Sequence, residues 1–415
     1  MERWYVRKLK EGLETKHFII LVGPRQTGKT TALTQLNQYL KAEGKAVAYI
    51  NLENPLVLQE VNKHPEHLLN YTDFFRLPEG EKLFLLVDEV QYAADPSNLL
   101  KFLYDEYHDR LKIIATGSSS FYIDRKFGDS MMGRKRLVQS GTLNFTEFLH
   151  FSGNDALMDE LDKLAQNPQY RSLQEPKLKN LLEQYLTYGG YPEVVLATDE
   201  KEKQMVLQGI GTSIIKKDLL DSGLTDDLKF AQFLRLLAGE TGKQTNLNSI
   251  SKSLKINNKK AEEMMYVARK SFIIETISPF FRNFRKELTK MPKAYFIDSG
   301  LRNFLINDFR RPSLRQDKGE VLENYVFRLL WDSYSTDQLH HWRTADQYEV
   351  DFVIENNREK GMAWEVKWDG ETSLSSGQKK FAETYENFPL KKLCWQNPDA
   401  NSIEILSVAG GTKQG

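Results

Sequence analysis

The chain of 415 residues has little cysteine, no excess of either charge and no long apolar run. The single Cys394 excludes a disulfide within the chain and any site built on several cysteines, and its apolar neighbours predict a small core residue. No apolar run approaches the roughly 20 residues that a membrane-spanning helix needs, and the first residues carry charges throughout, so we expect a cytoplasmic protein without membrane contact. Basic and acidic residues number 57 each, so any attraction for nucleic acid has to be local.

The order of apolar runs and helical patterns predicts an α/β chain of four parts. In residues 1–150, apolar runs at 17–22, 46–52, 83–88, 111–116 and 136–143 alternate with helical patterns at 30–43, 65–75 and 97–109. This alternation is typical of a parallel sheet covered by helices on both faces. Residues 151–225 predict a helical lid or linker, broken by two glycines and a proline at 188–192. Residues 226–305 have the element order of a winged helix-turn-helix, and 306–410 predict a long helix followed by strands and another helix.

Residues 23–30 fit the glycine-framed phosphate loop at every required position. The loop follows an apolar strand and opens a helix, where its backbone amides and the helix N-terminus favour phosphate oxygens. We expect Lys29 to contact the β- and γ-phosphates of ATP and the Thr30 hydroxyl to bind Mg²⁺. The predicted nucleotide-binding residues are Gly23, Pro24, Arg25, Gln26, Thr27, Gly28, Lys29, Thr30 and the adjoining Thr31.

Polar residues also end two other strands of the predicted sheet. Asp88 ends a buried apolar strand and is expected on the magnesium side, while Glu89 is placed to polarise the attacking water as a general base. In the next strand, Ser118, or alternatively Thr116, is a candidate sensor of the γ-phosphate. The alternative for the acidic pair is an ordinary exposed turn.

Arg134 is the candidate arginine finger. It lies in the sequence MetGlyArgLysArg and is expected to reach a γ-phosphate of its own subunit or of a neighbouring one, which would imply a homo-oligomer. A solvated basic loop is the alternative.

A second group of carboxylates lies near the C-terminus. Glu365 and Lys367 are two apart on a predicted strand and therefore share a face, and Asp351 joins them if the strands form a hairpin. Glu323 on the preceding helix adds a third carboxylate. Such a set suits phosphodiester hydrolysis with Mg²⁺ held by Asp351 and Glu365, whereas the alternative is a strand with a surface Glu–Lys pair.

These motifs carry a family resemblance over residues 10 to 370. The first 150 residues resemble AAA-type P-loop ATPases, and the whole chain is similar to a prokaryotic group in which such an ATPase is fused to a C-terminal domain of unknown function. The last hundred residues resemble the PD-(D/E)xK nuclease superfamily, the restriction-endonuclease-like fold. That resemblance implies catalytic roles for Glu323, Asp351, Glu365 and Lys367, although members of this superfamily also serve as binding modules.

Residues 252–293 hold eleven Lys and Arg against four Glu, which favours DNA as a partner of the predicted winged helix. Protein contact is the alternative. Together these patterns predict a magnesium-dependent ATPase whose nucleotide state is coupled to DNA binding or cleavage. The rival hypothesis is an ATP-controlled signalling or scaffold switch whose nuclease-like domain only binds partners.

Overall fold

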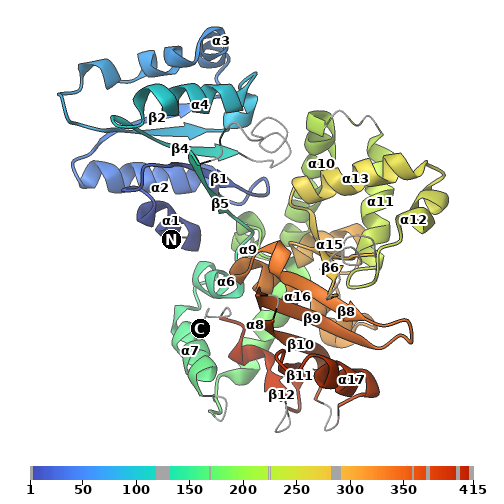
Figure 1. Cartoon of the computed structure of the whole chain (residues 1–415). Helices are drawn as coiled ribbons and strands as arrows, with labels where there is room; N and C mark the ends of the chain where they lie inside the picture. Colours follow the sequence, from blue (N-terminus) through green and yellow to red (C-terminus); the bar gives the residue numbers. More distant parts are fainter. Residues whose placement is uncertain are drawn as a thin grey trace. The chain divides into compact units, whose positions relative to one another are not determined.

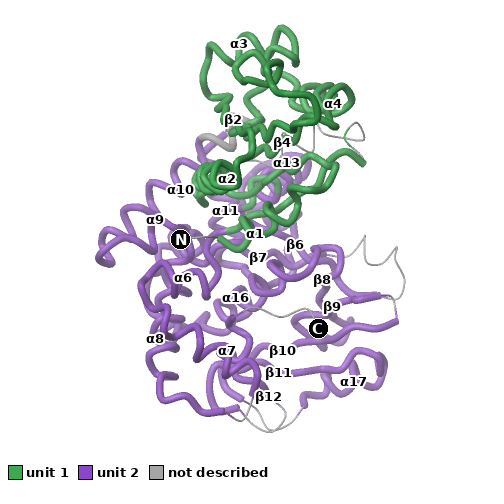
Figure 2. The backbone as a smooth tube through the Cα atoms, turned by 90° about the vertical axis from the view of Figure 1, so that its left-hand side faces the viewer, with its two compact units in different colours: residues 1–141, 270–272 green, residues 142–269, 273–415 purple. Residues whose placement is uncertain are grey.

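The computed structural model describes residues 3–117, 131, 133–167, 170–222, 224, 226–281, 291–357, 359–370, 374–398 and 402–410, without the side chains of 217–222. Contacts divide the chain into two compact units (Figure 2). Unit 1 comprises residues 1–141 and 270–272, and unit 2 comprises 142–269 and 273–415. The finer division into four domains stays a prediction.

Unit 1 is a parallel sheet with the strand order β2-β3-β4-β1-β5 (Figure 1). Its strands are β1 (Phe18–Val22), β2 (Ala46–Asn51), β3 (Leu83–Asp88), β4 (Leu111–Gly117) and β5 (Lys135–Gln139). The helices are α1 (Trp4–Glu11), α2 (Lys29–Ala42), α3 (Pro55–Lys63) and α4 (Pro96–Tyr107). All five predicted strands are present. Because β4 lies between β1 and β3, the carboxyl ends of these three strands meet at one edge of the sheet.

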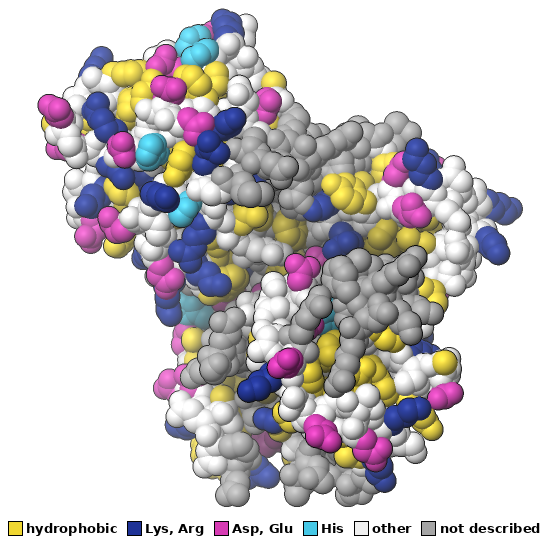
Figure 3. Space-filling model, in the orientation of Figure 1, with side chains coloured by type: hydrophobic (Ala, Val, Ile, Leu, Met, Phe, Trp, Pro, Cys, Tyr) yellow, Lys and Arg dark blue, Asp and Glu magenta, His cyan; other side chains and the backbone are white. Residues whose placement is uncertain are grey.

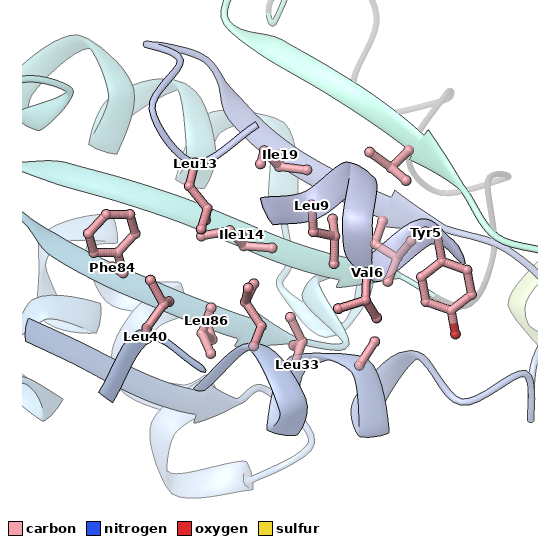
Figure 4. Packing of buried hydrophobic residues seen from close by; sticks show 14 residues of the cluster. Tyr5, Val6, Leu9, Leu13, Ile19, Leu33, Leu40, Phe84, Leu86 and Ile114 are labelled. Carbon is pink, nitrogen blue, oxygen red and sulfur yellow. The ribbon is translucent and has the colours of Figure 1, made fainter. Parts of the chain in front are cut away.

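Successive side chains of each strand point to opposite faces of this sheet. Ile19, Phe84, Leu86 and Ile114 pack against α1 and α2 (Figure 4). On the other face, the ring of Phe18 lies 5.1 Å from that of Tyr104 of α4. Strands buried on both faces read as continuous apolar runs, and this explains why the sequence predicts them well.

One predicted helix of unit 1 differs from the structure. The pattern at 65–75 predicts a single helix, but the chain forms α3 earlier and then two 3₁₀ helices, Pro65–Tyr71 and Phe74–Arg76. Pro65 disfavours the helical conformation of the residue before it, and His64 accordingly is extended, with φ −155° and ψ 134°.

Unit 2 begins with helices that surround the 188–192 break. They are α6 (Phe145–Phe151), α7 (Met158–Gln166), α8 (Glu175–Tyr188), α9 (Pro192–Leu196) and α10 (Glu200–Ser222). The break is tightly packed, because a Cβ on Gly190 would lie 2.2 Å from the carbonyl oxygen of Leu143. Asp298 accepts a hydrogen bond from the Gly190 amide at 2.8 Å, so the break is anchored to the later part of the unit.

The expected three helices and two strands follow. They are α11 (Asp227–Gly239), α12 (Leu247–Leu254), α13 (Asn258–Lys270), β6 (Ile274–Pro279) and β7 (Lys293–Phe296). Strands β6 and β7 pair in an antiparallel manner, but β6 also pairs in parallel with β8 of the C-terminal sheet. The two strands therefore extend that sheet instead of standing apart, and the winged helix stays a prediction.

The C-terminal part of unit 2 completes a seven-stranded sheet of order β12-β11-β10-β9-β8-β6-β7. Its remaining elements are α15 (Ser299–Ile306), α16 (Lys318–Ser333), β8 (Leu339–Arg343), β9 (Glu349–Asn357), β10 (Lys360–Asp369), α17 (Ser376–Thr384), β11 (Leu390–Gln396) and β12 (Ser402–Glu404). The rings of Tyr295 and Phe327 stack at 4.7 Å, which packs α16 on β7. Within the described part of the chain, no helix combines the length and apolar character needed to span a bilayer.

Candidate functional site

The phosphate loop joins the end of β1 to the start of α2. Gly28 adopts a φ of 87°, which favours glycine. Gly23 has no room for a side chain, because a Cβ would lie 2.0 Å from Ser140 Oγ. Lys29 is 5% exposed, and its Nζ donates to the carbonyl oxygens of Gly23 at 3.1 Å and of Pro24 at 2.6 Å. The lysine thus folds back over the loop.

Several other predicted loop residues are more exposed than Lys29. Gln26, Thr30 and Thr31 are exposed, and Arg25 is partly exposed. Thr30 stands in the first turn of α2, next to Lys29, and is exposed to solvent.

Arg3, which precedes α1, and Tyr5 of α1 donate hydrogen bonds to the loop, contacts that the sequence analysis missed. Arg3 Nη1 donates to the carbonyl oxygen of Thr27 at 2.8 Å, and Arg3 Nη2 donates to that of Gly141 at 3.0 Å. The Tyr5 hydroxyl donates to the same Thr27 oxygen at 3.2 Å. In a planar trans peptide the carbonyl and the next amide point in opposite directions, so these bonds orient the Gly28 amide away from α1. An arginine among the first residues gave no signal that it contacts the loop.

Asp88 ends β3 and is 1% exposed. Its carboxylate accepts hydrogen bonds from the hydroxyls of Tyr49, at 2.9 Å, and of Thr116 at the end of β4. Thr116 Oγ1 also accepts from the Glu89 amide at 3.1 Å, and Glu89 itself has a φ of 56° and accepts from Gln91 Nε2. The ends of β3 and β4 are therefore joined through one hydroxyl, and Thr116 is the sensor candidate that the structure describes.

Two further candidates of the nucleotide site have different outcomes. Ser118 lies outside the described residues. Arg134 lies next to the amino end of β1, where its carbonyl accepts from the Phe18 amide at 2.9 Å, and its guanidinium pairs with Asp105 at 2.6 Å. Because the phosphate loop follows the other end of β1, roughly 13 Å away at about 3.3 Å per residue, this placement argues against a finger role in its own subunit. A role in a neighbouring subunit stays a prediction.

In unit 2, the structure brings together the residues of the predicted C-terminal group. Strands β9 and β10 form the expected hairpin, and the Val366 amide donates to Asp351 Oδ2 at 2.9 Å. Lys367 Nζ lies 3.0 Å from Glu365 Oε1, so the two side chains share a face as expected. Glu365 is 5% exposed.

Glu323 joins this group through a lysine that the sequence analysis did not include. Lys293 Nζ of β7 lies 3.0 Å from Glu323 Oε1, 2.6 Å from Glu349 Oε1 and 3.7 Å from Asp351 Oδ1. The Tyr295 hydroxyl donates to Glu323 at 2.6 Å. Lys293 and Tyr295 are two apart on a strand and thus share a face, a signal that was present in the sequence. We call Glu323, Glu349, Asp351, Glu365 and Lys293 the carboxylate cluster.

Burial dominates the ionisation of the carboxylate cluster. It raises the pKa of Glu365 to about 7, assisted by the charge of Asp351 and opposed by Lys367. Burial also raises the pKa of Glu323 to about 7, with Lys293 opposing the shift. For Lys293, burial lowers the pKa, but the facing carboxylates, led by Glu323, raise it well above its usual value. Lys293 is therefore an ammonium ion.

The candidate DNA contacts are only partly described. Lys259 is exposed in the first turn of α13, and Lys260 Nζ lies 3.7 Å from Asp226 Oδ2. Arg282, Arg285 and Lys286, the expected wing residues, lie outside the described residues.

Three family models match consecutive parts of the chain. Residues 15–149 match an AAA domain, residues 179–311 match a domain of unknown function (DUF8612), and residues 318–409 match another domain of unknown function (DUF4143). The predicted AAA-type P-loop domain in unit 1 is thereby confirmed. The match to the C-terminal part names no activity.

Relatives align with most of the chain. An uncharacterized protein of Haemophilus influenzae is 25% identical over 97% of this chain and 96% of its own length. An uncharacterized protein of Methanocaldococcus jannaschii is 26% identical over 81% of this chain and 71% of its own.

Two solved structures with bound nucleotide are also similar to this chain, with low TM-scores. AMPPCP-bound DnaA from Aquifex aeolicus has a TM-score of 0.29 at 15% identity, covering 65% of this chain and 88% of its own. The ADP form of the Aeropyrum pernix ORC2 protein has a TM-score of 0.33 at 13% identity, covering 66% and 85%.

Proposed function

We propose that unit 1 binds ATP with Mg²⁺ and hydrolyses it. The observation that carries this proposal is the meeting of three polar strand ends at one sheet edge: the phosphate loop after β1, Asp88 at the end of β3 and Thr116 at the end of β4. The AAA-domain match over residues 15–149 supports it. Phosphate oxygens of the nucleotide would replace the loop carbonyls as acceptors for Lys29, and the Gly28 amide would add a further donor.

The donor set of this edge fits Mg²⁺, which prefers carboxylate and hydroxyl oxygens together with phosphate. Thr30 and Asp88 would hold the ion, which neutralises charge on the phosphates when bound. Glu89 would accept the proton of the attacking water, once its carboxylate exchanges the Gln91 amide for that water. The Thr116 hydroxyl links the Glu89 amide to the Asp88 carboxylate.

Nucleotide binding and turnover test this proposal separately. We expect Lys29→Ala to abolish ATP binding in calorimetry. Glu89→Gln should keep ATP binding but slow phosphate release about 100-fold or more, because general-base catalysis contributes at least that much. Lys41→Ala, on the exposed face of α2, is the matched control and should behave as the wild type. A wild-type protein that neither binds nor hydrolyses ATP in excess Mg²⁺ would exclude the proposal.

Coupling of this nucleotide state to DNA binding by unit 2 is the next part of the proposal. The local excess of basic residues at 252–293 supports it, whereas Figure 3 shows acidic and basic side chains interspersed over unit 1. We expect DNA affinity to change between the ATP and ADP states and to fall with salt. Lys259→Ala should weaken DNA binding, and Lys177→Ala, an exposed lysine of α8, should not. Equal effects of the two variants would contradict a specific DNA surface.

DNA cleavage is the second candidate, and the gathering of Asp351, Glu365 and Lys367 favours it. An unchanged product pattern with Glu365→Ala, across single-stranded, duplex and branched DNA, would remove it. The rival, a cytoplasmic ATP-controlled switch whose C-terminal domain only binds partners, predicts slow turnover that DNA does not change and an ATP-dependent oligomer in sizing experiments.

A further inference from the structure

The carboxylate cluster contains a cation of the chain itself. Its acids come from α16, β9 and β10, whereas Lys293 comes from β7, and the lysine is 1% exposed. The ammonium lies 3.0 Å from Glu323 and 2.6 Å from Glu349, distances at which it satisfies both carboxylates directly. Lys293 thus lies against three acids of the cluster, among them Asp351, 3.7 Å away, which the nuclease resemblance would assign to a metal ion.

The surroundings hold this arrangement in place. A Cβ on Gly242, which has a φ of 77°, would lie 3.1 Å from the Glu323 carboxylate and would crowd it. The Gly242 amide donates to the carbonyl oxygen of Ala294 at 3.1 Å, beside Lys293. The segment before α12 therefore fixes both the acid and the strand that carries the lysine.

The cations of the chain offset all but one of the carboxyl groups of the cluster. Four carboxyl groups (Glu323, Glu349, Asp351 and Glu365) face three cations (Lys293, Arg343 and Lys367), with Arg343 Nη1 3.0 Å from Glu349 and Lys367 Nζ 3.0 Å from Glu365. Over the described ranges, no group of three His, Cys, Asp or Glu side chains is set to hold a metal ion. The Mg²⁺ that the nuclease resemblance implies does not fit this arrangement.

We propose that Lys293 is the resident counter-cation of the carboxylate cluster and that it closes the cluster to divalent metal ions. A divalent ion needs the same carboxylate oxygens at 2.0–2.6 Å, and an ammonium in contact with them both blocks the position and repels the ion. Removing the lysine charge while keeping its volume should therefore create a divalent-ion site. This inference does not depend on ATP hydrolysis, and it argues against the magnesium-dependent DNA cleavage given above as the second candidate; its readout is ion binding.

The test is a Mn²⁺ titration of the nucleotide-free full chain, with free Mn²⁺ measured by electron paramagnetic resonance. We expect Lys293→Met to bind one more ion per chain than the wild type, and Lys293→Arg, which keeps the positive charge, to bind no extra ion. Lys243→Met is the matched control, because this 60% exposed lysine lies 3.9 Å from Glu320 outside the cluster. The double variant Lys293→Met with Glu323→Gln should lose the extra ion.

Thermal unfolding and circular dichroism establish that each variant is folded. A folded Lys293→Met chain without the extra ion overturns the proposal. If Lys293→Met does not fold, the wild type and Asp351→Asn decide the question: equal Mn²⁺ binding by the two supports a closed cluster. A wild-type ion that disappears in Asp351→Asn would overturn it.

Discussion

Replacing Arg3 with alanine should weaken unit 1 and its nucleotide binding, although Arg3 lies far from the loop in the sequence. The guanidinium is 5% exposed and donates to two main-chain carbonyls, Thr27 at 2.8 Å and Gly141 at 3.0 Å. A hydrogen bond from a charged donor contributes about 1.5–3 kcal/mol, so losing two should lower the free energy of unfolding of unit 1 by about 3–6 kcal/mol. Tyr5 still holds the Thr27 carbonyl, which places the expected loss at the lower end.

The same change should affect ATP binding through the Gly28 amide. If the peptide between Thr27 and Gly28 becomes free to rotate, binding has to order it again, and a cost of about 1.4 kcal/mol would weaken ATP binding about tenfold. Calorimetry with a non-hydrolysable ATP analogue measures this shift directly.

Trp4 makes the stability measurement specific, because the other five tryptophans of the chain lie at 331 and beyond, in unit 2. Urea unfolding followed by fluorescence, with and without Trp4→Phe, isolates the transition of unit 1. Arg7→Ala is the control, since Arg7 is exposed on the same helix. If Arg3→Ala and Arg7→Ala agreed within about 0.5 kcal/mol, the size expected of surface substitutions, the bracing role would be refuted.

Three other predictions follow from single contacts. Gly23→Ala should abolish nucleotide binding, and Ser140→Gly should not rescue it, because the added Cβ would still lie 2.5 Å from the Ser140 carbonyl oxygen; calorimetry on the single and double variants checks this. Thr116→Val should lower kcat for ATP at least tenfold with KM changed only a few-fold, since Asp88 loses one of its two hydroxyl donors, and Thr116→Ser should restore the rate in steady-state assays. Between pH 4.5 and 7, Glu365 should contribute a loss of about 3 kcal/mol in the stability of unit 2 as pH rises, because the folded state raises its pKa from 4.5 to about 7 and so binds its proton more tightly than the unfolded chain; Glu323, whose pKa is also raised to about 7, adds to the same slope, so Glu365→Gln should reduce the slope in urea unfolding without abolishing it.

The sequence predicts most of unit 1 because its signals are local. Strands β1, β3 and β4 are buried apolar runs, and the phosphate loop is a continuous motif whose glycines have specific reasons, such as the close approach of Ser140 to Gly23. Asp88 and Thr116 end neighbouring strands, so the parallel order of the sheet brings them together. The brace by Arg3 was not predictable in this way, because it depends on where α1 packs.

The hairpin of unit 2 was also predictable from local signals. Glu365 and Lys367 share a face because strand side chains alternate, and Asp351 reaches them through the neighbouring strand. The pairing of β6 with β8 was outside this reasoning, since it joins residues about sixty positions apart that show no shared pattern.

Lys293 shows how burial could predict long-range ion pairs that local sequence patterns do not reveal. A lysine in an apolar strand and several acids on a later helix and strand are each costly to bury alone, because a buried charge without a partner loses far more hydration than it regains. If both belong to the core, each requires the other, and the structure pairs them across 30 residues to Glu323 and 58 to Asp351. The same argument bears on function. The cluster looks like a metal site from Glu323, Asp351 and Glu365 alone, but it becomes a nearly balanced ion-pair network once Lys293 is included, so cation binding by the Lys293→Met chain decides between the two descriptions.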